Sequence, residues 1–172
     1  VCSSDLSHAG TATSTKTWEE MKAVELLPFE AGIAAGADVV MAAHITTPNA
    51  TEDGLPASLS YTILTERLRG ELGFTGVICT DGLGMKAITD HYSPAEAAIA
   101  ALDAGADLFL LPADLQEAFD GVVAAVESGR ISEERLDESV RRILTLKEKA
   151  DLSLRASTPA DTLLDRLSRL WN

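Results

Sequence analysis

The chain has 172 residues, of which 46% are hydrophobic and 24% charged, and its formal net charge is −13. This length and composition are typical of one globular domain with its own core rather than of a disordered chain. The negative charge argues against nucleic acid or an anionic membrane as partner, because their phosphate groups would repel it. No apolar run approaches the roughly 20 residues of a membrane span. The two cysteines, Cys2 and Cys79, show no metal-binding spacing.

The first six residues differ in character from those that follow. Val-Cys-Ser-Ser-Asp-Leu, residues 1–6, is what a widely used sequencing-library adapter encodes in one reading frame. We therefore interpret residues 1–6 as non-native and expect natural sequence to begin near Ser7, with a part of the protein missing before it. Localisation is left open, because an export signal would precede Val1.

From residue 17 onward, helix-like and strand-like patterns alternate. Apolar residues at spacings of three or four predict a helix over residues 17–35, broken at Pro28. The continuous apolar run 37–44 predicts a buried parallel strand. The Pro, Asn, Asp and Gly content of residues 46–57 predicts a loop after that strand.

A second helix and strand follow this loop. The helix is predicted over residues 60–72, with Ser60 as its N-cap and Gly73 just past its end. Residues 76–80 then predict a second buried strand that stops at Asp81. A loop or short helix leads on from there.

The third unit opens with Ser93, Pro94 and Glu96, residue types that are typical of a helix start, and Gly105 ends this helix. The run 106–111 predicts a third buried strand. Further helices are predicted over residues 115–128, 132–149 and 160–170.

The same four residues, Ala-Gly-Ala-Asp, occur at positions 35–38 and 104–107. Each copy joins a helix end to a strand start, as expected of a (β/α) architecture. Three such units and a leading helix make about half of an eight-stranded barrel, which needs about 250 residues when whole. The sequence therefore predicts an α/β fold: a partial (β/α)8 TIM-type barrel of about three parallel βα units with trailing helices. Residues 7–150 form this half barrel, and residues 151–172 a partly helical tail.

A polar residue follows each predicted strand at its carboxyl end, where the active sites of parallel α/β barrels lie. His44 follows the first strand, Asp81 the second and Asp114 the third. A rigid strand would orient the Asp81 carboxylate as a nucleophile requires. The alternative from position alone is that Asp81 caps the turn or helix that follows.

The segment Thr80-Asp81-Gly82-Leu83-Gly84-Met85 resembles the Thr/Ser-Asp-x-Leu-x-Met segment of glycoside hydrolase family 3, in its β-N-acetylglucosaminidase branch. Other segments resemble the same family in the same order, and the resemblance covers nearly all of residues 7–149. These segments are ELLPF (25–29), AGAD (35–38), MAAHI (41–45), LPASLS (55–60), LRGELGF (68–74) and AGAD (104–107).

The resemblance implies catalytic roles for Asp81 and His8. The matching aspartate of the family forms the covalent glycosyl-enzyme, so Asp81 is the expected nucleophile. The branch takes its acid/base from a histidine in an Asp-Ser-His sequence, and Ser7-His8 matches its end; imidazole titrates near neutral pH and suits both roles. The family's Asp, which would orient the imidazole, is Leu6 here, and Asp5 is one residue out of register. A solvated loop histidine is the alternative for His8.

Two further residues are expected to meet the substrate. His44 is expected to line the sugar site, with a hydrogen-bonded core histidine as the alternative. Met85 is expected to pack beneath the sugar ring, with a core position as the alternative. Asp38 and Asp107 begin strands at the opposite end, the stability face of a barrel, and are interpreted as structural.

The implied reaction is a double displacement at terminal, non-reducing β-linked N-acetylglucosamine, so the expected partner is a small carbohydrate. Asp81 attacks, His8 protonates the leaving oxygen, and water then hydrolyses the glycosyl-enzyme. No metal or organic cofactor is expected. We expect the 172 residues alone to be inactive, because half a barrel leaves open sheet edges. Two alternatives remain: a β-glucosidase-like specificity, and a non-catalytic carbohydrate-binding or scaffold protein.

Overall fold

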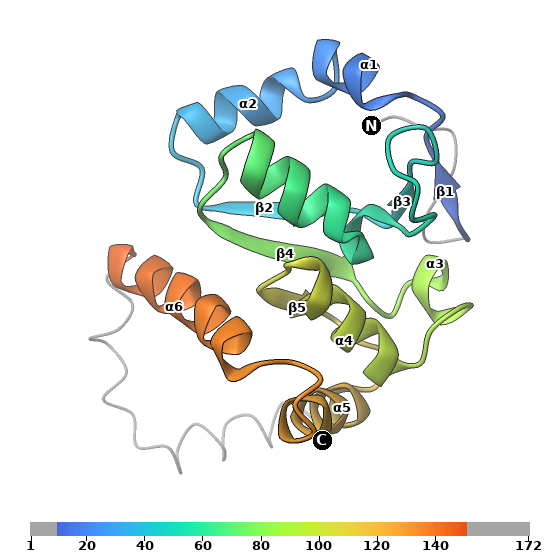
Figure 1. The fold of residues 1–172 in the computed structure, drawn as a ribbon, viewed down its shortest axis with the longest axis vertical. Helices are drawn as coiled ribbons and strands as arrows, with labels where there is room; N and C mark the ends of the chain where they lie inside the picture. Colours follow the sequence, from blue (N-terminus) through green and yellow to red (C-terminus); the bar gives the residue numbers. More distant parts are fainter. Residues whose placement is uncertain (1–9, 151–172) are drawn as a thin grey trace, which may run out of the picture.

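Three parallel strands lie at the centre of the fold, in the spatial order β2-β4-β5 (Figure 1). The computed structural model describes residues 10–150. The strands of the central sheet are β2 (Val39–Ala42), β4 (Val77–Gly82) and β5 (Leu108–Leu110). A second, smaller pair of parallel strands consists of β1 (Ala12–Thr13) and β3 (Ile45–Thr46), which the sequence did not predict. The parallel α/β architecture confirms the predicted fold class.

Helices connect the strands and continue beyond the last of them. Within residues 10–150 they are α1 (Trp18–Ala23), α2 (Leu27–Ala34), the 3₁₀ turn η1 (Ala57–Leu59), η2 (Thr62–Glu71), α3 (Lys86–Thr89), α4 (Pro94–Ala104), α5 (Leu115–Glu127) and α6 (Glu133–Lys149). Side chains cap the first turns of four of them by accepting a backbone N–H, and these caps are Thr17, Ser93, Asp114 and Ser132. Local polar chemistry therefore determines where α1, α4, α5 and α6 begin.

The segment predicted as one helix over residues 17–35 forms two helices, α1 and α2. The chain turns between Ala23 and Leu27, so the break does not lie at Pro28 as predicted. Pro28 occupies the first turn of α2, where its missing N–H costs no helical hydrogen bond. The proline therefore begins a helix here rather than ending one.

The next helix, η2, runs from Thr62 to Glu71, within the predicted range 60–72, but differs in winding. It is a wide helix with i→i+5 hydrogen bonds. Ser60 accepts the Ile63 N–H at 3.2 Å, as expected of a capping hydroxyl. Gly73 follows the helix with a φ of 70°, a left-handed conformation that favours glycine.

Burial differs between the middle strand and its two neighbours. β4 has a partner strand on each side, and Ile78 of β4 is completely buried against η2 and α4 in the main hydrophobic core. β2 and β5 each pair with one strand of this sheet in the part of the chain that the structure describes. Val39 and Met41 of β2 are 43% and 54% exposed. The prediction of a buried strand is therefore right for β4 and wrong for β2 and for β5, where Leu108 is 36% exposed.

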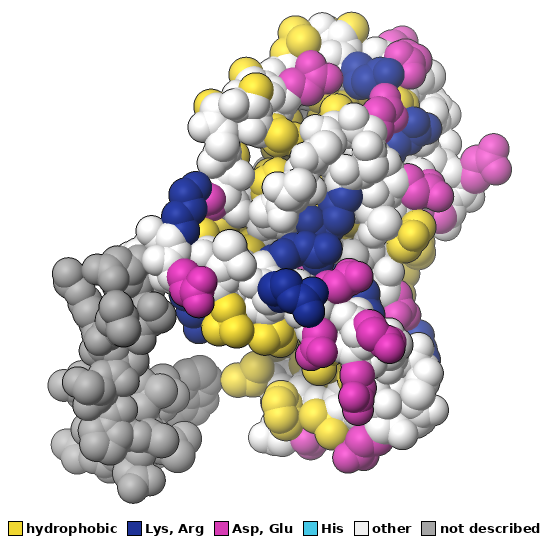
Figure 2. All heavy atoms as spheres, turned by 60° about the vertical axis from the view of Figure 1, so that its left-hand side comes forward, with side chains coloured by type: hydrophobic (Ala, Val, Ile, Leu, Met, Phe, Trp, Pro, Cys, Tyr) yellow, Lys and Arg dark blue, Asp and Glu magenta, His cyan; other side chains and the backbone are white. Residues whose placement is uncertain are grey.

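The amino ends of the strands are held by ion pairs around Asp107, whose side chain is fully buried. Its Oδ2 lies 2.6 Å from Arg69 Nη2 and accepts the Ile78 N–H at 2.9 Å. Its Oδ1 lies 3.0 Å from Arg142 Nη1 and accepts the Ser139 hydroxyl at 2.7 Å. In Figure 2 the molecule is turned so that the α6 side of Figure 1 comes forward. Lys and Arg side chains gather in the middle of this face. This cluster joins α6 to the sheet.

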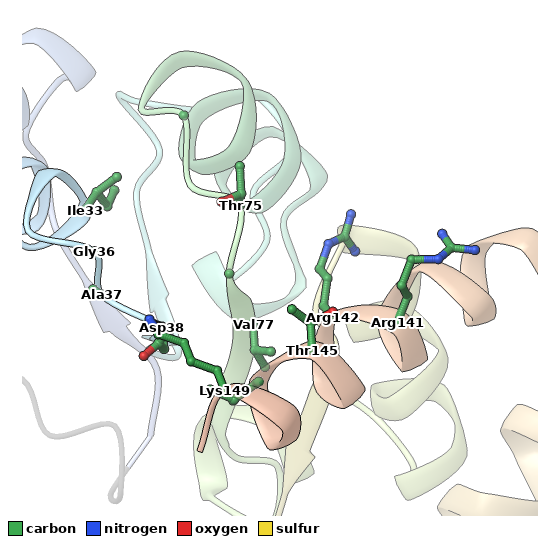
Figure 3. Close-up of a pocket in the computed structure, with 13 residues that line it drawn as sticks. Ile33, Gly36, Ala37, Asp38, Thr75, Val77, Arg141, Arg142, Thr145 and Lys149 are labelled. Carbon is green, nitrogen blue, oxygen red and sulfur yellow. Dashed lines mark hydrogen bonds and ion pairs between the residues drawn. The ribbon is translucent and has the colours of Figure 1, made fainter. Parts of the chain in front are cut away.

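A pocket of about 450 Å³ opens beside this cluster, between α6 and the residues that precede β2 and β4 (Figure 3). Asp38 at its wall pairs with Lys149 of α6 at 2.6 Å. The pocket lies at the amino ends of the strands, which is the stability face of a barrel. The interpretation of Asp38 and Asp107 as structural residues agrees with these contacts.

Candidate active site

Asp81 lies in the last part of β4, at the carboxyl end of the middle strand. The strand extends to Gly82, so Asp81 is part of it and does not follow it as predicted. Its side chain is half-buried, and its Oδ1 accepts the Gly82 N–H at 2.7 Å. Strand pairing therefore orders the backbone on either side of Asp81, and the Gly82 N–H holds one of its carboxylate oxygens in place.

The turn after Asp81 is hydrogen-bonded to the end of β5. The Leu83 N–H donates to Leu110 O, and the Gly84 N–H donates to Leu111 O, both at 2.8 Å. A Cβ on Gly84 would lie 3.0 Å from Leu111 O, so glycine permits this close approach. Within the turn, the Met85 N–H donates to Gly82 O at 3.1 Å. These bonds fix the path of the chain immediately after the carboxylate.

Leu111, the residue after β5, has an unusual backbone and an unusual exposure. Its φ is 44°, which is uncommon for a residue with a branched side chain, and its side chain is 80% exposed. Such conformations cost on the order of 1–3 kcal/mol and persist where the surroundings enforce them. Here the bond from Gly84 to the Leu111 carbonyl helps to enforce it. Local strain thus lies directly beside the turn that follows Asp81.

His44 follows β2 and is fully buried. Its Nδ1 lies 2.6 Å from Ser58 Oγ, and its Nε2 lies 2.9 Å from Gly82 O. Burial lowers the pKa of His44, against the opposing effects of the Gly82 carbonyl and the nearby charge of Asp81, so the neutral imidazole is favoured. Both ring nitrogens therefore already have protein partners.

The other predicted site residues lie in different surroundings. His8 lies outside the described residues. Met85 is half-buried and precedes α3, with its Sδ 3.7 Å from where a Cβ on Gly82 would stand. Asp114 accepts the Glu117 N–H at 2.9 Å and caps α5. The structure thus brings Asp81, His44 and Met85 together around Gly82 and assigns Asp114 to a helix cap.

A cavity of about 320 Å³ with a mixed polar and apolar lining lies at this end of the sheet. Its lining residues are Thr11, His44, Thr46, Gly54, Pro56, Ala87, His91 and Tyr92. A volume of this size is within the range of small-molecule sites. Within residues 10–150, no group of His, Cys, Asp or Glu side chains could hold a metal ion, and no helix is long and apolar enough to cross a membrane.

Sequence reasoning missed two features of this site: Ser58 as the partner of His44, and Leu111 as a strained, exposed residue. Ser58 lies in the LPASLS segment, which supported the family resemblance without a chemical role. A small hydroxyl residue within an apolar segment that follows a loop could have indicated a buried hydrogen bond. Nothing in the local sequence indicated the positive φ of Leu111, because its bond partner lies 27 residues earlier in the chain.

Comparison with known proteins shows which protein family this chain belongs to. The family described as "Glycosyl hydrolase family 3 N terminal domain" matches residues 2–146. The chain therefore belongs to glycoside hydrolase family 3, and Asp81 lies within the matched range. The predicted family is confirmed.

Proteins similar to this chain include β-hexosaminidases and related enzymes. "Beta-hexosaminidase A" of Pseudoalteromonas piscicida is 33% identical over 92% of this chain and 30% of its own length. A family 3 β-N-acetylglucosaminidase structure from Paenibacillus sp. str. FPU-7 has 43% identity and a TM-score of 0.84 over 90% of this chain and 30% of its own. "Beta-N-acetylglucosaminidase/beta-glucosidase" of Cellulomonas fimi is 33% identical over 86% of this chain and 27% of its own length. The chain spans about a third of these proteins.

Proposed function

We propose that this chain carries the nucleophile of a retaining glycosidase that releases terminal β-linked N-acetylglucosamine. The observation that carries the proposal is the place of Asp81: a half-buried carboxylate at the carboxyl end of the middle strand, directly before a turn that is hydrogen-bonded to the residues at the ends of both neighbouring strands. The names of the Pseudoalteromonas and Paenibacillus relatives support this substrate class.

In the proposed reaction, the Asp81 carboxylate attacks the anomeric carbon and forms a covalent glycosyl-aspartate. Because Oδ1 accepts the Gly82 N–H, Oδ2 is the oxygen that attacks. His8 protonates the leaving oxygen, and then takes a proton from the water that attacks the intermediate. Met85 contacts the sugar. The reaction as written needs no metal or organic cofactor.

We further propose that the 172 residues alone do not catalyse this reaction. A sugar must be enclosed on several sides for a transition state to be stabilised. Here the edge strands β2 and β5 carry solvent-exposed apolar side chains, including Met41 at 54% and Leu108 at 36%. Strands with such exposure fit a barrel that continues past both of them.

The test uses a hybrid protein in which residues 7–150 replace the matching segment of the Paenibacillus enzyme. We expect this hybrid to hydrolyse an aryl β-N-acetylglucosaminide, and Asp81→Asn to lower its kcat by about 10⁴-fold or more. The matched control is Asp114→Asn, which removes a carboxylate from the same end of the sheet and should leave kcat within about threefold. A folded hybrid without activity, or an active one that tolerates Asp81→Asn, contradicts the proposal. Hydrolysis by the 172 residues alone would contradict the second part.

A second candidate function is action on β-glucosides. The Cellulomonas fimi relative bears both activities in its name, and the solved structure of "Beta-glucoside phosphorylase BglX" has 31% identity and a TM-score of 0.81 over 88% of this chain and 29% of its own. The turnover of an aryl β-glucoside by the same hybrid should therefore be measured, with and without phosphate as the acceptor. Faster turnover of the glucoside than of the N-acetylglucosaminide would favour this second function.

A further inference from the structure

We infer that His44 is a positioning residue for Asp81, which acts by holding the Gly82 carbonyl and not by contacting the sugar. The inference rests on the proposed function of Asp81 and deepens it, because it names the group that keeps the nucleophile in place. It also gives a reason for a fully buried imidazole at the carboxyl end of the sheet.

The hydrogen bonds of His44 define its tautomer. A carbonyl oxygen can only accept, so the 2.9 Å contact with Gly82 O requires the proton to be on Nε2. In the neutral ring Nδ1 is then an acceptor, and the Ser58 hydroxyl, at 2.6 Å, is its donor. Ser58 is itself fully buried, and its N–H donates to Ala43 O at 3.2 Å. The chain of donors therefore runs from Ser58 through His44 to Gly82.

Gly82 connects this chain to the nucleophile. Its carbonyl accepts from His44 and from the Met85 N–H, and its own N–H donates to Asp81 Oδ1. The bonds from Leu83 and Gly84 to the end of β5 hold the turn from one side. His44, which follows β2, holds it from the other. Loss of the His44 bond would free Gly82 on the β2 side and move the N–H that orients Asp81.

A neutral ring suits this position. An imidazolium so close to Asp81 would form an ion pair with it and lower its nucleophilicity. Burial favours the neutral form, because a charged ring would be removed from water. His44 can therefore orient the turn without neutralising the carboxylate.

The first experiment follows the imidazole and backbone signals of the 172-residue chain by NMR. We expect His44 to be the neutral Nε2–H tautomer from pH 6 to 8, and His44→Leu to shift the Gly82 amide and Asp81 carboxyl signals. His44→Gln, which retains an N–H donor, should shift them less. An Nδ1–H tautomer, or unchanged Gly82 and Asp81 signals in folded His44→Leu, overturns the inference.

A second variant protects the test against misfolding of His44→Leu. Ser58→Ala removes only the donor to Nδ1; because the Gly82 carbonyl still requires the proton on Nε2, the inference predicts the same tautomer with a smaller shift at the Gly82 amide than in His44→Leu. Loss of the Nε2–H tautomer in folded Ser58→Ala would contradict the inference.

The kinetic experiment uses the hybrid protein described above. Misplacing a nucleophile by about 1 Å costs about 100-fold in rate, so we expect His44→Leu to lower kcat by about that factor. Because His44 does not touch the sugar, KM should change by less than about threefold, and His44→Gln should restore part of kcat. A rise in KM at unchanged kcat would indicate a sugar contact and overturn the inference. An inactive unsubstituted hybrid would contradict the proposed function instead, while the NMR result still decides the role of His44.

Discussion

At the amino ends of the strands, the carboxylate of Asp107 has five partners: three arginines, a serine hydroxyl and a backbone N–H. At the carboxyl end of β4, the carboxylate of Asp81 accepts one hydrogen bond, from Gly82, among the contacts of the described residues. Asp81 belongs to β4 and Asp107 directly precedes β5, so the two aspartates lie at opposite ends of the same sheet. An aspartate at the amino ends of the strands is therefore fully engaged by partners, whereas the aspartate at the carboxyl end of β4 keeps one oxygen without a partner among the described residues.

The difference shows how one sheet separates stability from reactivity. A carboxylate with every lone pair occupied is a poor nucleophile but a strong link between α6, η2 and the strands. A carboxylate with a free oxygen contributes little to folding, and its position must come from other groups. At the carboxyl end these groups are His44 and the backbone at the end of β5.

The largest expected effect concerns Asp107. Replacing it by Asn leaves three arginines around a neutral side chain, and breaking a buried ion pair from one side typically costs about 3–5 kcal/mol of folding free energy. We expect a loss near the lower limit, because Arg69, Arg135 and Arg142 keep 14–25% side-chain exposure. Urea unfolding of the 172-residue chain measures it.

Asp81→Asn is the matched variant for that measurement, and it should change the free energy of unfolding by less than about 1 kcal/mol. Equal losses at the two positions would remove the distinction between the two ends of the sheet.

A smaller effect concerns the pH dependence of stability at the carboxyl end. Because the pKa of His44 is lowered on folding, the unfolded chain binds more protons than the folded one below pH 6.5. Stability should therefore fall as pH decreases through 6.5, by at most about 1.4 kcal/mol per pH unit from this residue. Unfolding of the chain and of His44→Gln between pH 5 and 7.5 tests this. The same pH dependence in both proteins would exclude His44 as its source.

The smallest effect concerns Leu111. Glycine adopts a positive φ without strain, so Leu111→Gly should relieve the backbone at φ 44°. Glycine also increases the entropy of the unfolded chain, which opposes this gain. We expect the free energy of unfolding to stay within about 1 kcal/mol of the original value, because the exposed leucine side chain loses little packing. A loss above about 2 kcal/mol in thermal or urea unfolding would mean that Leu111 packs as a core residue does.

Local patterns were enough to predict much of the fold. The predicted helix start at Ser93, Pro94 and Glu96 is confirmed, with Ser93 and Glu96 forming a capping box, and Gly105 ends α4 with a φ of 111°. The strand around Ile78 was evident as a short apolar run, and it is the middle strand of the sheet. Such features depend on neighbours a few residues apart, so the sequence carries them directly.

Asp81 was predicted in the same way, because a polar residue at the carboxyl end of a buried strand can be recognised from the sequence. Its motif led to a family that the comparisons confirm. What the sequence alone determined about this protein is therefore its architecture, its family and the position of its proposed nucleophile.

Tertiary structure alone decided the surroundings of that nucleophile. His44 contacts Ser58, 14 residues away, and Gly82, 38 residues away, and no local pattern distinguishes such a histidine from one that faces a ligand. Likewise, the exposure of Met41 depends on which elements cover β2, and not on its own segment. The physical reason is that hydrogen-bond partners and burial arise from packing between segments far apart in the chain, whereas caps, turns and strand runs arise within one segment.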